Sequence, residues 1–197
     1  SEMCIRDRQL ADIYVRPQQD FSGEEPAFSI RQVISEPDGD SASFAHSVVL
    51  DNLPVVDTQD GENIVTVGVE DNLATLNLLP SLLDSDGSET LTGLVILDSG
   101  EGQLMLDGQA ISVPSGGLDL GQLAQDEGIT LTELATSGRL TWQPPEDGSG
   151  LYSVPNSYQI TDTANNGVQA VSDYTGNLQV DVAAQVDVDA EYLPTLT

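Results

Sequence analysis

Apolar and polar residues alternate along most of the chain, in short runs separated by turn-forming residues. Val65, Val67 and Val69, for example, alternate with Thr66 and Gly68. A period of two residues is typical of a strand with one buried face. Alternation or short apolar runs predict strands at 28–31, 44–50, 65–69, 73–79, 91–97, 103–106, 109–113, 138–142, 153–163 and 168–182. The spacing of apolar residues changes to a helical one only at 118–125, where we expect a single short helix.

Turn signals separate these runs. Asp107-Gly108 and Asn166-Gly167 are dipeptides that favour tight β-hairpins, and the run 36–40 (Glu-Pro-Asp-Gly-Asp) is a strong turn signal. Many short strands joined by turns predict an all-β chain, and specifically an antiparallel Greek-key β-sandwich.

An internal repeat organises the chain. Residues 14–23 align with residues 141–150 at a single offset, with Pro, Asp, Ser and Gly coinciding. In this alignment Trp142 falls on Val15, which indicates a core position. We therefore expect 58–186 to form one complete repeat and 10–57 to form the C-terminal half of a preceding one. Residues 187–197 would link to a following repeat.

Residues 1–9 differ from the rest of the chain in composition. They contain two of the five basic residues and Cys4, the only cysteine. The run resembles translated sequencing-adapter sequence, so we leave it out of the fold prediction. We expect the chain to be part of a longer protein whose export signal lies elsewhere.

Charge is the most unusual property of the composition. There are 33 acidic and five basic residues, a net charge of −28 and a pI of about 4.1. Such a surface repels nucleic acid and anionic membranes. No run of roughly 20 apolar residues is present to insert into a bilayer. The acidity is compatible with a halophilic surface, with simple solubility or with bound cations. The clustering of Asp beside Gly and Asn at turns favours cations.

Acidic residues are concentrated at turns on both sides of the apolar run 73–83. Successive antiparallel strands reverse direction, so strand counting distributes these turns between the two ends of the sandwich. The upper end would gather Asp84, Asp86, Glu89 and Asp162 beside the incoming linker with Asp57 and Asp60. The lower end would gather Glu70, Asp71 and Asp147 beside the outgoing linker with Asp187, Asp189 and Glu191. Ca²⁺ takes six to eight oxygen ligands, so we expect these acids to bind Ca²⁺. The alternative is that Asp, Asn and Gly are only good turn formers.

Catalytic sites are not indicated. His46 is the only histidine, and its alternation with Phe44 and Val48 is that of an ordinary strand residue. A Ser-His or Cys-His pair cannot be built, and no phosphate loop or zinc spacing appears. We predict that the chain is not an enzyme. A ligand- or carbohydrate-binding β-sandwich of an extracellular protein is the alternative to a structural module, and it requires an exposed aromatic patch.

Four motifs carry a resemblance to a known family: Val69-Glu70-Asp71, the run 84–91 (Asp-Ser-Asp-Gly-Ser-Glu-Thr-Leu), the run 144–150 (Pro-Pro-Glu-Asp-Gly-Ser-Gly) and the run 158–162 (Tyr-Gln-Ile-Thr-Asp). In order and spacing they resemble the cadherin-like repeats of giant bacterial surface adhesins, including RTX-type adhesins exported by type I secretion.

The resemblance implies a cadherin- or Ig-like sandwich with Ca²⁺ at repeat junctions. It also implies a secreted, cell-surface location and an extender role in adhesion or biofilm formation. Neighbouring repeats would be the direct partners, with host or surface ligands contacted through other domains.

The sequence departs from the family pattern at the junctions. The usual Asn-Asp-Ala-Pro is absent, as is the Gly-Gly-x-Gly-x-Asp nonapeptide of RTX calcium rolls. The run 84–87 also lacks the later bidentate acid of an EF-hand.

Overall fold

The computed structural model describes residues 14–24, 28–57, 63–82 and 86–186. Contacts divide the chain into two compact units. Unit 1 comprises residues 1–55 and 163–169, and unit 2 comprises residues 56–162 and 170–197. The predicted boundary near residue 57 lies close to this division. Residues 58–62, at the start of the predicted complete repeat, and the predicted linker 187–197 lie outside the described residues.

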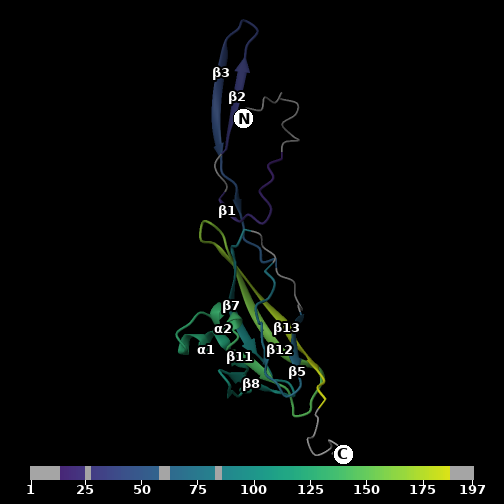
Figure 1. The fold of residues 1–197 in the computed structure, drawn as a ribbon. Helices are drawn as coiled ribbons and strands as arrows, with labels where there is room; N and C mark the ends of the chain where they lie inside the picture. Colours follow the sequence, from purple (N-terminus) through teal and green to yellow (C-terminus); the bar gives the residue numbers. More distant parts are fainter. Residues whose placement is uncertain (1–13, 25–27, 58–62, 83–85, 187–197) are drawn as a thin grey trace, which may run out of the picture. The chain divides into compact units, whose positions relative to one another are not determined.

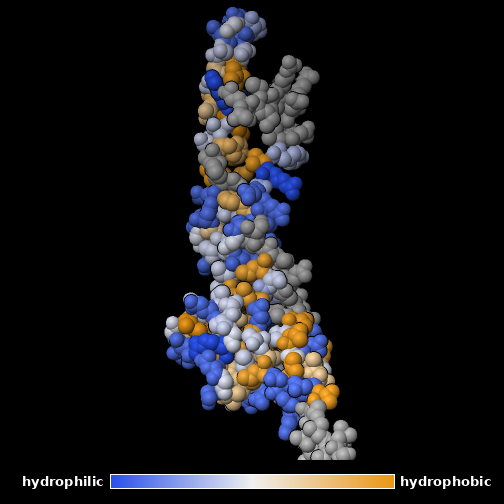
Figure 2. Space-filling model, in the orientation of Figure 1, coloured by the Kyte–Doolittle hydropathy of each residue, from blue (hydrophilic) through white to orange (hydrophobic). Residues whose placement is uncertain are grey.

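Among its described residues, unit 1 contains two small antiparallel pairings (Figure 1). Strand β1 (Gly23–Glu24) pairs with β4 (Asp51–Asn52), and β2 (Phe28–Ser35) pairs with β3 (Ser41–Val48). The β2–β3 hairpin agrees with the predicted strands, but neither face is buried, and His46 is exposed on β3. Apolar side chains therefore lie on its surface (Figure 2), and Phe44 is 51% exposed.

Unit 2 is built mainly from two sheets (Figure 1). Its strands are β5 (Asn63–Val69), β6 (Ala74–Thr75), β7 (Glu89–Ile96), β8 (Gln103–Leu106), β9 (Gln109–Ala110), β10 (Leu118–Asp119), β11 (Leu140–Gln143), β12 (Gly150–Thr163) and β13 (Gln169–Ala183). One sheet has the order β10-β7-β12-β13-β5 and the other has the order β6-β11-β8-β9. The chain is thus predominantly β, as predicted, and each predicted strand overlaps an observed one.

Three details correct the sequence-based expectations. Strand β5 pairs in parallel with β13, so the larger sheet is mixed rather than purely antiparallel. The strand expected at 73–79 is confined to β6. Two helices are present among the described residues instead of one: α1 (Leu120–Asp126) and α2 (Leu131–Thr136).

Capping explains both helices. The side chain of Asp119 accepts hydrogen bonds from the backbone N–H groups of Gly121 and Gln122. Thr130 and Glu133 form a capping box, in which each side chain binds the other residue's backbone N–H. Apolar residues after each cap then turn towards the core, where Leu120 and Leu134 are buried.

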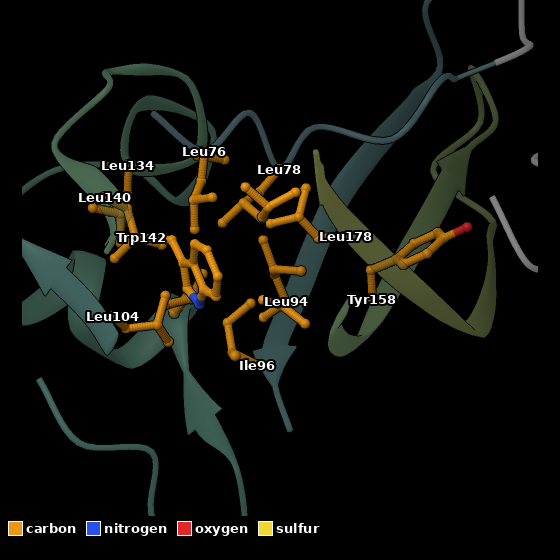
Figure 3. Close-up of a cluster of buried hydrophobic side chains, with 14 of the residues drawn as sticks. Leu76, Leu78, Leu94, Ile96, Leu104, Leu134, Leu140, Trp142, Tyr158 and Leu178 are labelled. Carbon is orange, nitrogen blue, oxygen red and sulfur yellow. The ribbon is translucent and has the colours of Figure 1, made fainter. Parts of the chain in front are cut away.

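The hydrophobic core draws side chains from both sheets (Figure 3). Leu94, Ile96 and Leu178 come from the larger sheet, whereas Leu104 and Trp142 come from the smaller one. Trp142 is 0% exposed, and its indole N–H donates to the carbonyl of Ser99 at 2.8 Å. This confirms the predicted core position of Trp142 and gives unit 2 a sandwich-like arrangement.

Backbone geometry recurs at the repeat spacing. Asp20 and Asp147 both have left-handed backbone, with φ of 60° and 55°, and Gly23 and Gly150 have φ of 102° and 113°. Both pairs are separated by the offset that aligns 14–23 with 141–150 in the sequence. Left-handed backbone is uncommon outside glycine, so the match at the aspartates is informative.

A hairpin turn also recurs, at a spacing one position longer than that offset. In the first copy, the N–H of Glu36 donates to the carbonyl of Asp40, and the N–H of Gly39 donates to that of Glu36. In the second copy, the N–H groups of Ala164 and Gly167 make the same bonds to the carbonyls of Val168 and Ala164. A side-chain bond is repeated as well, because Asp38 Oδ1 accepts from Asp40 and Asn166 Oδ1 accepts from Val168.

Candidate metal sites at the two ends of unit 2

Two of the predicted upper ligands, Glu89 and Asp162, are brought together at the start of β7. Glu89 and Asp162 are register partners in the antiparallel β7–β12 pair, and their side chains are 5% and 3% exposed. The backbone N–H of Asp57 donates to Glu89 Oε1 at 2.6 Å, so the incoming chain meets this pair. Two buried carboxyl groups therefore lie opposite each other on neighbouring strands.

Asp86 is also near this position in sequence but is exposed. Its Oδ1 accepts from the N–H of Ser88 at 2.8 Å, which closes the turn leading into β7. Asp84 and Asp60 lie outside the described residues.

The lower group is brought together where β5 ends. Glu70 is 6% exposed, and its Oε2 accepts from the backbone N–H of Gln185 at 2.7 Å. The N–H of Asp147 lies 3.4 Å from Asp71 Oδ1, so the turns at 71 and 147 are in contact. The outgoing chain therefore reaches Glu70 just before Asp187 and Asp189, which lie outside the described residues together with Glu191.

The two groups lie at opposite ends of the larger sheet. Val69 pairs with Ala183 at the end of the parallel β5–β13 ladder, whereas Asp162 lies at the other end of β12, next to the turn into β13. The division into an upper and a lower group, which strand counting predicted, is therefore present for the described residues.

Hydrogen bonds of Asn72 and the left-handed conformation of Asp71 stabilise the turn that follows β5. The side-chain amide of Asn72 donates to the carbonyl of Glu70 at 2.9 Å, and the N–H of Asn72 donates to the carbonyl of Val69 at 3.1 Å. Asp71, with φ of 60°, adopts the left-handed conformation that short polar side chains tolerate.

Over the described ranges, the structure gathers no three His, Cys, Asp or Glu side chains closely enough to hold one ion. The carboxylates are present instead as the pair Glu89 and Asp162 and as the neighbours Glu70, Asp71 and Asp147. Their oxygen donors are of the kind that a hard cation such as Ca²⁺ takes.

Basic side chains are scarce around these acids. Of the five basic residues in the sequence, Arg139 alone lies in the segment 56–197, which carries most of the acidic residues. Arg139 is engaged with Asp107, through hydrogen bonds that lower the pKa of Asp107, and with Glu127 at 2.6 Å. The carboxyl groups of Glu70, Glu89 and Asp162 are buried, and those of Glu70 and Glu89 accept backbone N–H hydrogen bonds from Gln185 and Asp57.

A carbohydrate-binding site would require an exposed patch of aromatic side chains. Trp142 and Tyr158 are buried, and Tyr158 stacks on Tyr174 with ring centroids 5.3 Å apart. Among the described residues, the large aromatic side chains that are clearly exposed are Tyr14 and Phe44, both in unit 1.

Unit 2 also has a groove of about 390 Å³ between α1 and the strands β7 and β12. Its lining includes Thr92, Asp119, Gln122, Gln159 and Asp173. The groove offers hydrogen-bonding groups without an exposed ring.

Comparisons of the chain with protein-family models, with curated proteins and with solved structures find no match. Within the described part of the chain, no helix combines the length and the apolar character needed to cross a membrane.

Proposed function

We propose that this chain is a calcium-stiffened structural extender, made of tandem cadherin- or Ig-like Greek-key repeats in a secreted bacterial surface adhesin, and that it is not catalytic. The observation that carries the proposal is the recurrence of backbone geometry at a nearly constant spacing. The left-handed aspartates and glycines recur at the offset of the sequence alignment, and the hairpin turn with its three hydrogen bonds recurs one position beyond it. Recurrence at a fixed spacing is characteristic of tandem-repeat architectures.

Strand order supports the Ig-like topology. If β5, β6, β7, β8, β11, β12 and β13 are lettered A to G, one sheet has the order B-E-D, with β9 added, and the other has the order A-G-F-C, with β10 added. Immunoglobulin-type sandwiches likewise keep B, E and D in one sheet and C, F and G in the other. In this chain, strand A (β5) pairs in parallel with strand G (β13).

The ends of unit 2 support a role for Ca²⁺. Glu89 and Asp162 receive the incoming chain at Asp57, and Glu70 receives the outgoing chain at Gln185. Upper ligands would come from Asp57, Asp84, Asp86, Glu89 and Asp162. Lower ligands would come from Glu70, Asp71, Asp147, Asp187 and Asp189. Bound Ca²⁺ would fix each linker to the end of the sandwich and so restrict bending at the junction.

Calcium titration of the full chain tests the proposal. After chelation, we expect calorimetry to show Ca²⁺ uptake at roughly 10⁻⁴–10⁻³ M, the range of extracellular modules. Thermal melting should shift upward, and small-angle scattering should give a larger radius of gyration in Ca²⁺ than in chelator. Mg²⁺, which requires tighter octahedral geometry, is the control ion.

A double variant tests the upper site separately. Asp84→Ala with Asp86→Ala should lower both the melting temperature in Ca²⁺ and the amount of Ca²⁺ bound. If neither quantity changes, the upper site does not exist. If the unsubstituted chain binds no Ca²⁺ at all, the proposed stiffening mechanism is wrong.

A ligand- or carbohydrate-binding module is the second candidate, and the groove beside α1, with its hydrogen-bonding side chains, is the observation that favours it. Glycan-array binding by the full chain that is lost in Gln122→Ala and Gln159→Ala would support this function instead of the extender.

A further inference from the structure

The hairpin turn 164–168 is attached to the edge of strand β1 within unit 1 (Figure 1). The N–H of Glu24 donates to Asn165 Oδ1 at 2.9 Å, and Asn165 Nδ2 donates to the carbonyl of Glu24 at 3.1 Å. The side-chain amide thus binds one strand residue as a neighbouring strand would. Asn166 Nδ2 adds a bond to Asp51 Oδ1 at 3.0 Å.

Gly23 makes this attachment possible. A Cβ on Gly23 would lie 2.0 Å from Asn165 Oδ1, and φ of Gly23 is +102°. Only glycine leaves room for the asparagine and tolerates this backbone conformation. Ser22 completes the surface, because its carbonyl accepts from the N–H of Asn165 at 3.4 Å. We call the set Ser22, Gly23 and Glu24 the turn receptor of unit 1.

Unit 2 contains the same backbone at the offset of the sequence repeat. Ser149, Gly150 and Leu151 are the equivalents of Ser22, Gly23 and Glu24, and φ of Gly150 is +113°. Here the space is open, because no atom of the described residues beyond the two adjacent positions lies within 4 Å of a Cβ built on Gly150, and Leu151 is 64% exposed.

A groove lies at this second receptor. It has a volume of about 730 Å³ and is lined by Ser149 and Leu151 on one side and by Asp98, Gly100 and Glu101 on the other. Strand β7 ends at Ile96, and the N–H of Leu97 donates to the carbonyl of Pro155. Leu151 lies beyond that point, where the edge of β12 is accessible.

The hairpin turn that binds such a receptor also recurs in the chain. Turns 36–40 and 164–168 share their backbone bonds, and the five residues of 36–40 are exposed. The hairpin therefore forms this turn whether or not a receptor is attached. In turn 36–40, however, Pro37 occupies the place of Asn165 and has no amide to bind a strand edge. The receptor consequently requires a turn with asparagine at that place.

We propose that Ser149, Gly150 and Leu151 form a receptor for the hairpin turn of a following copy of this repeat, and that an asparagine equivalent to Asn165 binds the backbone of Leu151. This inference rests on the tandem organisation in the proposed function and adds a direct contact that requires no Ca²⁺. Consecutive repeats would then be joined by a turn and a receptor as well as by the linker.

A two-copy fusion tests the receptor. In this fusion, residues 1–183 are followed directly by a second copy of residues 56–197. The junction is placed there because residue 183 is the equivalent of residue 55 at the spacing of the two hairpin turns. Only the segment 1–183 is labelled with ¹⁵N, by segmental ligation, and amide hydrogen exchange is measured by NMR in the fusion and in the unfused chain. The Leu151 amide should exchange at least tenfold more slowly in the fusion.

Asn165→Ala in the unlabelled added copy should return the exchange of Leu151 to the rate in the unfused chain. The Glu24 amide is the internal reference: it should be protected in both proteins and lose its protection only when Asn165 of the labelled copy is replaced. Gly108, on an exposed hairpin turn, should show no change in any variant.

Two results would overturn the inference. One is equal exchange of Leu151 in both proteins while the added copy melts cooperatively. The other is slowed exchange that survives Asn165→Ala in the added copy, since something other than the turn would then cover the groove. The measurement is made in chelator, so failure of Ca²⁺ binding would leave it interpretable, and failure of the receptor would leave the Ca²⁺ titration unaffected.

Discussion

Replacing Glu89 by glutamine should change the stability of unit 2 in opposite directions with and without Ca²⁺. Glu89 is 5% exposed and is the register partner of Asp162, which is 3% exposed. Glutamine keeps the oxygen that accepts from the N–H of Asp57 and removes one negative charge. In chelator the variant should therefore be slightly more stable, by up to about 1 kcal/mol, because like charges on opposite strands are destabilising.

Ca²⁺ should reverse this order. A site with a dissociation constant of roughly 10⁻⁴–10⁻³ M stabilises the folded state by about 1.4–2.7 kcal/mol at roughly 10 mM Ca²⁺. For a chain of this size, that is a rise in melting temperature of about 3–11 °C. Glu89→Gln removes a ligand charge from the upper site, so most of this rise should be lost in the variant.

Thermal unfolding followed by circular dichroism, in chelator and in Ca²⁺, measures both effects. Asp181→Asn is the matched control, because Asp181 is an exposed carboxylate on β13 of the same sheet. The control should keep the full rise in Ca²⁺. An equal rise in Glu89→Gln and the unsubstituted chain would refute the assignment of Glu89 to a Ca²⁺ site.

Three further predictions concern the stability of unit 2. Trp142→Ala removes a fully buried indole and should lower the free energy of unfolding, measured in urea, by about 3–5 kcal/mol. A decrease below about 1 kcal/mol would contradict the place of Trp142 in the core. Hydrogen bonds from Thr130 lower the pKa of Glu133 below 4.5, so the capping carboxylate stabilises the fold above that pH. The difference in melting temperature between wild type and Glu133→Gln should accordingly be present at pH 7 and disappear as the pH falls below 4.5, and a pH-independent difference would argue against the ionised cap. Arg139→Gln should lower the melting temperature less in high salt than in low salt, because the ion pairs of Arg139 are partly exposed and are screened; a salt-independent effect would indicate that packing of Arg139 dominates.

Much of the strand pattern could be predicted from the sequence because most long strands of unit 2 bury their apolar face. Strand β5 is the exception, since Val65, Val67 and Val69 are exposed and Thr66 is buried. In β13, Leu178, Val180 and Val182 are buried at a period of two, and the runs around β7 and β12 follow the same rule. The turn at Asn166-Gly167 was predicted for the same local reason, since glycine allows its φ of +86°.

Other features depend on contacts that alternation does not encode. The parallel pairing of β5 with β13 joins the two ends of unit 2 in sequence, and no local pattern distinguishes it from an antiparallel pairing. Helix α2 did have a local signal, the capping box of Thr130 and Glu133, which the spacing of apolar residues alone did not reveal.

The candidate site was predicted in part. Strand counting placed Glu89 with Asp162 and Glu70 with Asp71 and Asp147, because turn position follows from strand order. It gave no indication that three of these carboxylates would be buried, since burial depends on how the sheets close around them. No local pattern marked Asn165 as a binding residue, because its partner Glu24 is distant in the sequence.

The parallel β5–β13 pair determines how unit 2 would respond to tension. The ladder runs from Asn63 opposite Asn177 to Val69 opposite Ala183, so the chain enters at one end of the ladder and leaves at the other. A pull on the two ends of the unit therefore acts along these strands and loads the hydrogen bonds of the ladder in shear, all at the same time. An antiparallel hairpin pulled at its open end would instead lose its bonds one after another. Rupture of unit 2 then requires the first and last strands to slide past each other as a whole, which suits a segment that transmits mechanical load along its length.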